Sequence, residues 1–536
     1  MAYISIPSLN FRDLSLNISF FDGLSGTETN LEQEAEQEVN NEPFISPSLY
    51  NYLTKIKEEI DIYEEHWDYY KKITNPHEYI HTHIFGKNYS VCKYKPLSRA
   101  FFKMIEIVNI FNFLDEKYDI NCFHLAEGPG GFIEAFSYVR QNKQDNYYGM
   151  TLISSDVNIP SWKKSQTFLN NNKNVFIENG KSKNGDLFLE SNLNYINEKY
   201  GSSMEYITGD GGIDFSVDFN NQEEMSLKLI FSQIVYAIIM QKKHGHFVLK
   251  IFDIFKFKTV ELLFLLSNLY ENIYIYKPHT SRVANSEKYI ICKYFKANNN
   301  NLKNELLKNY KSIIGNIENI KSLFNKTFPN MFVNKIKEIN AIYGQQQIEN
   351  INNTLNLIRE YLNLENLDFH NNDLNNKNNS FELNFAKTNH ELSDEEKNES
   401  IENKISKKTR ILSSESINII INNDNQKNKE IDDEIYCYSP PSNIHILENN
   451  TKNDSKITNI LNYNINLNDD FKLAETNDIS DTSDTNEISD TSNNKIIKLN
   501  IEKFNNKINV LKNLNIQKSV HWCNKYSFTI NKNFND

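Results

Sequence analysis

Between residues 93 and 297, short apolar runs alternate with longer stretches in which apolar side chains recur every three or four positions. The short runs predict buried strands, and the longer stretches predict amphipathic helices. Strands that alternate with helices are typical of a parallel sheet covered on both faces, so we expect an α/β domain here. The predicted strands are Cys122–Glu127, Tyr147–Leu152, Asn174–Glu178, Met204–Asp210, His246–Phe252, Ile273–Tyr276 and Tyr289–Phe295, with helices near 97–111, 131–141, 222–243 and 257–270.

The last two predicted strands are separated by a short segment without a helical pattern. A parallel connection needs a long crossover, whereas antiparallel neighbours can be joined by a loop. We therefore predict a sheet that is mostly parallel, with the last strand antiparallel.

The chain outside this domain is predicted to be partly helical and partly unstructured. Beyond Phe369 the composition shifts to Asn, Lys, Ser, Asp and Ile. Such a tract cannot bury enough apolar surface to offset the entropy of ordering it, and apolar residues return only near its far end. The predicted divisions are a mobile acidic arm over 1–47, a helical extension over 48–92, the α/β domain over 93–297, a helical module over 301–368, a disordered tract over 369–500 and an ordered segment over 502–536.

Charge and cysteine usage narrow the classes of function. The 536 residues carry a formal charge of −12, and the acidic excess lies outside 93–297. This excludes a strongly basic, non-specific nucleic-acid binder but not an RNA partner. The five cysteines are scattered without a CxxC pair, which argues against a disulfide framework or a zinc cluster and fits a reducing compartment. No signal peptide or membrane span is visible, so we expect a soluble, intracellular protein.

The turn Glu127-Gly128-Pro129-Gly130-Gly131 follows a predicted strand and opens a predicted helix. Glycine lets the backbone approach a ligand closely, and a helix N-terminus offers unpaired amide groups. Dinucleotide folds place G-x-G-x-x-G at this point, but position 133 is Ile, which argues against NAD. The shorter loop fits a nucleoside without a pyrophosphate, such as S-adenosylmethionine. The alternative is a purely structural turn.

Two lysines stand in contexts that suggest chemistry. Lys103 lies on a predicted helix whose apolar stripe faces the core, four residues after Arg99. Like charges at this spacing disfavour an isolated helix, so the pair forms either a solvated face or a basic ledge for phosphate. Lys250 sits within a mostly apolar strand, where a lysine is costly to bury without a partner. Lys250 is therefore the sharpest single candidate.

Two carboxylates complete the set. Asp210 ends a predicted strand, and ligands bind at the carboxyl ends of parallel strands in open α/β sheets. A capping or turn aspartate is the alternative. Glu287 precedes the last predicted strand and by itself indicates little. Two lysines and two carboxylates around a nucleotide-type turn suggest methyl transfer to a ribose hydroxyl.

Seven segments, all in order, resemble the FtsJ/RrmJ-type ribose 2′-O-methyltransferases, in particular the branch of eukaryotic and viral mRNA cap methyltransferases. They are "SRAFFKMIEI", "HLAEGPGGFIEAF", "YGMTL", "NGDLF", "ITGDGGIDFS", "GHFVLKIFD" and "KPHTSRVANSEKYIICKYF". The resemblance spans about 93–297, under half of the chain, and implies a Rossmann-like methyltransferase sheet. The upstream "TNPHEYIHT" and the Asn- and Ile-rich filler suggest a large DNA virus or an AT-rich protist as the source.

The resemblance assigns the four charged residues to one active site. It implies that Lys250 accepts the ribose 2′-hydroxyl proton, that Lys103 tunes this base and that Glu287 orients its ammonium. It also implies that Asp210 holds the reacting groups near the sulfonium. Alignment of donor and acceptor supplies much of the acceleration and requires no metal. The residues implied for S-adenosylmethionine are Glu127, Gly128, Pro129, Gly130, Gly131, Tyr147, Thr151, Leu152, Asp186 and Asp210, and those expected to contact RNA are Lys95, Arg99 and Arg282.

The expected substrate is the single-stranded 5′ end of mRNA, because paired RNA hides base edges and constrains the ribose. Expected partners are this RNA and the capping or transcription machinery, without a membrane, in the cytoplasm or nucleus, or in the host cytoplasm for a virus. Two alternatives remain. One is the same reaction on ribosomal or transfer RNA. The other is a non-catalytic methyltransferase-fold subunit that binds RNA or a polymerase, against which the complete set of four charged residues argues.

Overall fold

The computed structural model describes residues 3–11, 14–21, 43–154, 161–212, 220–297, 300–374 and 486–531. Its α/β domain follows the predicted order of strands and helices. In chain order the domain contains α4 (Ala100–Phe111), β3 (Asn121–Leu125), α5 (Gly131–Arg140), β4 (Asn146–Met150), η2 (Trp162–Ser165), α6 (Gln166–Asn171), β5 (Val175–Ile177), α7 (Glu190–Tyr200), β6 (Met204–Gly209), α8 (Gln222–Met240), β7 (Gln241–Ile251), α9 (Phe257–Leu269), β8 (Tyr270–Tyr276) and β9 (Lys288–Phe295).

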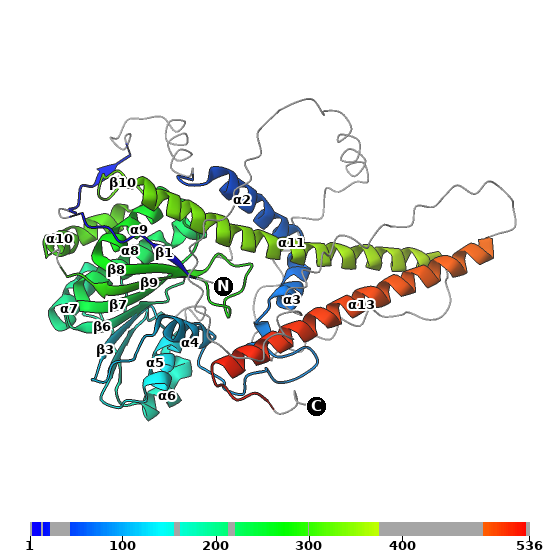
Figure 1. Ribbon diagram of the computed structural model, residues 1–536, viewed down its shortest axis with the longest axis horizontal. Coiled ribbons are helices and arrows are strands. Elements are labelled where there is room, and N and C mark those ends of the chain that lie inside the picture. Colours follow the sequence, from blue (N-terminus) through cyan, green and yellow to red (C-terminus); the bar gives the residue numbers. More distant parts are fainter. Residues whose placement is uncertain are drawn as a thin grey trace, which may run out of the picture. The chain divides into compact units, whose positions relative to one another are not determined.

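Among the described residues, eight strands form one sheet in the order β1-β8-β9-β7-β6-β3-β4-β5 (Figure 1). The five strands β3 to β7 pair in parallel. β9 lies between β7 and β8 and runs antiparallel to both. The mostly parallel sheet and its antiparallel last strand are thus confirmed. The helices α6 and α7 were not predicted, because their polar sequences show little apolar periodicity.

Alternating side chains of the strands fill two cores, one on each face of the sheet. Leu125 of β3 and Leu249 of β7 belong to the core that includes α8 and α9. Cys122 and Val248, on the same two strands, belong to the core that includes α4 and α5. Because helices cover both faces, the ends of the strands are the places where a ligand can reach the sheet.

β1 (Ile4–Ile6) and β2 (Ser19–Phe20) lie in the segment predicted to be a mobile arm. β1 pairs antiparallel with β8, and β2 pairs with β10 (Ile320–Ser322). The prediction of a mobile arm over 1–47 is wrong for these strands, because an open sheet edge supplies backbone partners that local sequence does not reveal. The acidic stretch from Glu32 to Glu42 lies outside the described residues.

Helices flank the domain on both sides in sequence. The disordered tract predicted over 369–500 is too long, because one helix continues to residue 374 and another begins at residue 486. Extending an existing helix into such a sequence needs no new helix nucleus. Residues 375–485 lie outside the described residues. No helix in the described part of the chain is long and apolar enough to cross a membrane. The flanking helices are α2 (Pro47–Ile62), α3 (Glu64–Thr74), η1 (Glu78–Ile80), α10 (Asn300–Asn316), α11 (Asn330–Leu374) and α13 (Asn486–Lys525).

The second half of α13 packs against the α/β domain and its helical extension, running toward α4 (Figure 1). Asn515 Nδ2 donates to the carbonyl oxygen of Ile73 at 2.6 Å. The Trp522 ring packs edge-on against Phe102 of α4, with ring centres 5.5 Å apart. The chain therefore returns to the domain after the Asn-rich tract.

Candidate active site at the carboxyl edge of the sheet

The four predicted catalytic residues lie at one edge of the sheet. Asp210 directly follows β6, and Lys250 is the penultimate residue of the neighbouring β7. Glu287 directly precedes β9, whose amino end lies at this same edge because β9 runs antiparallel to β7. Lys103 reaches the edge from the first turn of α4. Strand order and direction thus gather residues from four separate segments.

The four side chains form two ion pairs. Lys103 Nζ lies 2.7 Å from Glu287 Oε1 and 2.9 Å from Oε2. Lys250 Nζ donates to the backbone oxygen of Asp210 at 2.8 Å and lies 3.4 Å from its Oδ1. The four side chains are between 8% and 15% exposed. The resemblance implied that Glu287 orients the ammonium of Lys250. In the structure Asp210 makes that contact instead, because β6 and β7 are neighbouring strands.

Tyr289 connects the two ion pairs, and sequence reasoning missed it. Its hydroxyl donates to Asp210 Oδ1 at 3.0 Å and lies 3.5 Å from Glu287 Oε1. Tyr289 is paired with Lys250 across β7 and β9, so the two side chains stand on the same face of the sheet. The available signal was the two-residue period of a strand, which turns position 289 to the same side as position 287.

Burial and neighbouring charges act in opposite directions on Glu287. Burial raises the pKa of a carboxyl group, but the charges of Lys103 and Lys250 hold the pKa of Glu287 well below its usual range. Burial lowers the pKa of Lys103, and Glu287 opposes that shift. The pKa of Tyr289 is raised well above its ordinary value by burial and then by the nearby carboxylates. Glu287 therefore stays ionised at neutral pH, and Tyr289 stays a hydrogen-bond donor.

The loop between β8 and β9, which carries Glu287, is fastened to α4 by Glu106. This fully buried carboxylate accepts hydrogen bonds from the backbone N–H groups of His279 and Thr280, both at 2.8 Å. It also accepts from the Thr280 hydroxyl at 2.7 Å and from the Tyr276 hydroxyl at 2.8 Å. Glu106 lies three residues after Lys103, so α4 both fastens the loop and carries Lys103, the ion-pair partner of Glu287.

Two side chains of the loop region hold Glu287 itself. Ser281 Oγ donates to Glu287 Oε1 at 2.8 Å. The buried Lys277 Nζ donates to the backbone oxygens of Glu287, at 2.9 Å, and of Asn285. Burial, together with the charge of Lys288, lowers the pKa of Lys277 to about 7. Glu287 is therefore positioned through both its carboxylate and its backbone.

The glycine-rich turn is closely packed. Gly130 has φ +107°, a conformation that other residues rarely adopt. A Cβ on Gly131 would lie 2.3 Å from Ser98 Oγ, so only glycine lets α5 pack this closely against the segment before α4. Trp162, which is 8% exposed, packs against the position that a Cβ on Gly130 would occupy. Trp162 is thus a packing residue of the turn.

Two buried acceptors at this edge fit S-adenosylmethionine. Glu127 Oε1 accepts from the N–H groups of Phe132 and Ile133, at 2.6 and 3.4 Å. Within the described part of the chain, Glu127 Oε2 and Asn179 Oδ1 are buried without a hydrogen-bond partner. Burial and then the charge of Asp210 raise the pKa of Glu127 well above its ordinary value. An ammonium group, which this cofactor carries, satisfies such an oxygen.

Two of the residues implied for the cofactor lie just beyond β4. Leu152 is 40% exposed, whereas Thr151 is buried. The neighbouring Ile153 N–H donates to the carbonyl oxygen of Asn184 at 2.8 Å, which joins this segment to the turn containing Asp186. Thr151, Leu152 and Asp186 therefore come together.

Tyr147 does not join them. Its side chain is fully buried, and its hydroxyl donates at 2.8 Å to Asp145, which precedes β4 at the opposite, amino edge of the sheet. The assignment of Tyr147 to the cofactor is corrected to a core role, because the second residue of a parallel strand lies near the edge where that strand begins.

The three residues expected to contact RNA differ in their surroundings. Lys95 is exposed. Arg99 Nη2 donates to the carbonyl oxygen of Thr280 at 2.8 Å. Arg282 forms a two-fold contact with Glu78, with Nη2–Oε1 at 2.7 Å and Nε–Oε2 at 3.1 Å. Burial raises the pKa of Glu78, but the charges of Arg282 and Arg99 outweigh burial and hold that pKa well below its usual range. Arg282 thus already has a buried counter-charge.

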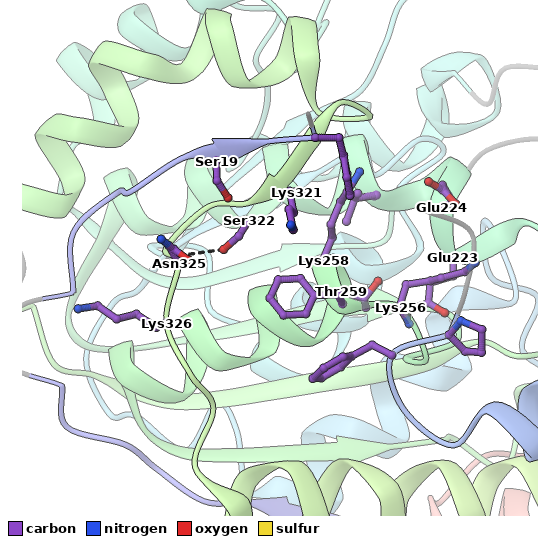
Figure 2. A pocket seen from close by; sticks show the side chains of 15 residues that line it. Ser19, Glu223, Glu224, Lys256, Lys258, Thr259, Lys321, Ser322, Asn325 and Lys326 are labelled. Atoms are coloured by element: carbon purple, nitrogen blue, oxygen red, sulfur yellow. Dashed lines mark hydrogen bonds between the residues drawn. The ribbon is translucent and has the colours of Figure 1, made fainter. Parts of the chain in front are cut away.

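A separate cavity of about 390 Å³ lies beside the start of α9 (Figure 2). None of the four predicted catalytic residues lines it. Glu223 accepts from the N–H groups of Phe255 and Lys256 at 3.0 and 2.8 Å, and Lys258 Nζ donates to the carbonyl oxygen of Ile317 at 3.0 Å. These charged groups hold the surrounding segments together. Within the described ranges, no group of three or more His, Cys, Asp or Glu residues could hold a metal ion.

Comparison with known proteins identifies relatives for the domain that carries this site. Residues 96–295 match the family model of the FtsJ-like methyltransferases. A cap-specific mRNA (nucleoside-2′-O-)-methyltransferase of Autographa californica nuclear polyhedrosis virus is 31% identical over 223 residues, covering 40% of this chain and 81% of that protein. A "Probable methyltransferase" of African swine fever virus is 27% identical over 307 residues, covering 50% of this chain and 67% of that protein.

The animal relatives are much longer than the matched region. A cap-specific mRNA (nucleoside-2′-O-)-methyltransferase 1 of Mus musculus is 28% identical over 322 residues, covering 55% of this chain and 36% of that protein. The family match coincides with the α/β domain, and the baculovirus relative is matched over most of its length. The chain therefore belongs to the FtsJ-like methyltransferase family.

Proposed function

We propose that the chain transfers a methyl group from S-adenosylmethionine to a ribose 2′-hydroxyl near the 5′ cap of mRNA. Family membership supports the reaction class, and the cap-specific names of the relatives favour mRNA over other RNA. One observation carries the proposal. Lys250 is held at the carboxyl edge of the sheet beside Asp210 and Tyr289, next to a glycine-rich turn with an unsatisfied carboxylate oxygen.

The proposed chemistry follows from these contacts. S-adenosylmethionine, when bound, supplies a methyl group activated on a sulfonium. Lys250 in its neutral form accepts the 2′-hydroxyl proton while the O–CH₃ bond forms and the S–CH₃ bond breaks. Asp210, 3.4 Å from Lys250 Nζ, stabilises the ammonium that results.

The remaining site residues position the reactants. Glu127 is proposed to hold the cofactor ammonium, on a turn whose shape Gly130 and Gly131 make possible. Thr151, Leu152, Asn179 and Asp186 are proposed to lie toward the ribose and adenine. Alignment of donor and acceptor supplies much of the proposed acceleration and requires no metal.

Lys95 and Arg99 are proposed to contact the RNA. Arg99 Nε is buried without a partner among the described residues, so it has a donor left for a phosphate. Arg282 is proposed to act mainly through Glu78, which holds it at the margin of the loop. The 5′ end of mRNA brings the enzyme near the capping or transcription machinery, which is its proposed setting.

The test is transfer of labelled methyl groups to capped mRNA, uncapped mRNA and ribosomal RNA, followed by nuclease mapping of the modified nucleotide. Label on the first transcribed nucleotides of capped RNA is the expected result. Label confined to ribosomal or transfer RNA would show that the substrate is not mRNA, while the proposed reaction, 2′-O-methylation of ribose, would stand. If no RNA is labelled while S-adenosylmethionine binds, the protein is a non-catalytic subunit instead.

A further inference from the structure

The last turns of α13 carry a stripe of basic side chains. Lys518, His521 and Lys525 are spaced by three and four residues, which places them on one side of a helix. His521 and Lys525 are exposed, and Lys518 is half-buried. The adjacent side of the helix is the one that packs on the domain; it includes Asn515, Ser519 and Trp522. The basic stripe therefore lies along the margin of the contact between α13 and the domain.

Two histidines of the domain lie next to this stripe. The rings of His77, just before η1, and His279, in the β8–β9 loop, are 5.1 Å apart and half-buried. Burial lowers the pKa of His77 to about 3, and the charges of His279, Lys518 and His521 add to that effect. Burial likewise lowers the pKa of His279, and the charge of Lys525 adds to that effect. We call these five residues (Lys518, His521, Lys525, His77 and His279) the α13 rim.

The α13 rim is continuous with the candidate active site. The backbone of His279 is bonded to Glu106, in the same loop that ends at Glu287. Trp522 of α13 packs on Phe102, the neighbour of Lys103. The α13 rim and the candidate active site therefore share the β8–β9 loop and the first turn of α4.

The lysines of the α13 rim lack the carboxylate partners that other basic residues have. Lys507, earlier on α13, pairs with Glu360 at 2.7 Å. Within the described part of the chain, neither Lys518 nor Lys525 lies within 4 Å of a carboxylate oxygen. Burial lowers the pKa of Lys518, so its charged form is disfavoured until an anion approaches. In a chain of net charge −12, two neighbouring lysines without carboxylate partners fit a polyanion.

We propose that the α13 rim binds the phosphates of the RNA substrate beyond the nucleotide that is methylated. The inference rests on the proposed function for its choice of RNA. It assigns to the C-terminal helix a part in substrate binding, so that the domain alone forms only part of the RNA path.

The test uses the full-length protein with Lys518→Gln and Lys525→Gln combined. The matched control is Lys308→Gln combined with Lys311→Gln, which removes two exposed lysines three residues apart on α10. Methyl transfer is measured on a capped RNA of only a few nucleotides and on a capped RNA several times longer, over a range of salt concentrations. RNA binding is followed in parallel by fluorescence anisotropy.

For the longer RNA, the rim variant should raise KM several-fold, and two lost phosphate contacts should reduce the slope of log affinity against log salt by about 1.4. The maximal rate, the KM for the shortest RNA and the affinity for S-adenosylmethionine should stay unchanged. The control variant should match the wild type in all of these. Equal effects of both variants, or unchanged binding of the longer RNA, would overturn the inference. Absence of methylation by the wild type would instead count against the proposed function, and anisotropy would still test the rim.

Discussion

The amine of Lys250 is held at the carboxyl edge of the sheet by the backbone oxygen and the carboxylate of Asp210. Lys250→Ala should lower the rate of methyl transfer by about 10² or more, since the proposed base is lost. Lys250→Arg should also fail, because a guanidinium stays protonated. Labelled methyl transfer to capped RNA measures both effects.

Binding of S-adenosylmethionine by these variants, followed by calorimetry, should stay within a few-fold of the wild type, because Lys250 is proposed to act on the acceptor and not on the cofactor. Retained activity of Lys250→Ala at high pH would show that another group, or hydroxide, takes the proton.

The ion pair of Glu78 and Arg282 is expected to contribute mainly to the stability of the fold. Arg282→Ala leaves the fully buried Glu78 carboxylate without its ion-pair partner, which should lower the free energy of unfolding by about 3 kcal/mol. Replacing both, as Glu78→Gln with Arg282→Met, should recover most of that loss. Denaturant unfolding of the three proteins measures this, and equal stability of Arg282→Ala and wild type would contradict it.

The same pair predicts a dependence on pH. The folded-state pKa of Glu78 is lowered, so its stabilising effect is fully present above its unfolded pKa of about 4.3 and is lost as pH falls below that value. The wild type should therefore lose stability on acidification more steeply than the double variant. If the free energies of unfolding of the wild type and the double variant fell equally between neutral and acidic pH, this prediction would be wrong.

At the scale of elements, the position of the β8–β9 loop depends on α4 through Glu106. Glu106→Gln turns an amide N–H₂ toward backbone donors of the loop, so the loop and Glu287 should shift. A displacement of this kind should lower kcat roughly tenfold to a hundredfold, with little effect on the affinity for S-adenosylmethionine. Single-turnover rates with saturating cofactor provide the measurement.

Glu261 on α9 gives a matched control, since it is a buried carboxylate that accepts from the N–H groups of Leu323 and Phe324 at 2.8 and 3.0 Å. Glu261→Gln should lower the unfolding temperature about as much as Glu106→Gln while leaving kcat intact. A similar loss of kcat in both variants would mean that general destabilisation, not loop position, is responsible.

For the whole molecule, the described contacts of α13 lie on the helices that flank the α/β domain and on the domain itself. Lys507 pairs with Glu360, and Asn515 bonds to Ile73. Replacing residues 375–485 by a flexible linker should therefore leave the fold and the affinity for S-adenosylmethionine unchanged. Circular dichroism and cofactor binding measure this, and an insoluble or non-binding product would show that the tract supports the fold.

The sequence by itself determined the α/β domain, its strands, the glycine-rich turn and the family resemblance that singles out Lys103, Asp210, Lys250 and Glu287. These features could be predicted because the periods of strands and helices and the composition of turns are local properties. The strand of Lys250 and the turn of Gly130 carry their signals within a few residues.

The tertiary structure decided which of these groups meet. Strand order put Asp210 rather than Glu287 beside Lys250, and the reversed direction of β9 brought Tyr289 between the two ion pairs. Pairing with β8 placed β1 at the edge of the sheet. Contacts between residues far apart in the sequence, such as Trp522 and Phe102, brought α13 to the margin of the site. Such contacts depend on the shape and direction of distant elements, which no local pattern of side chains encodes.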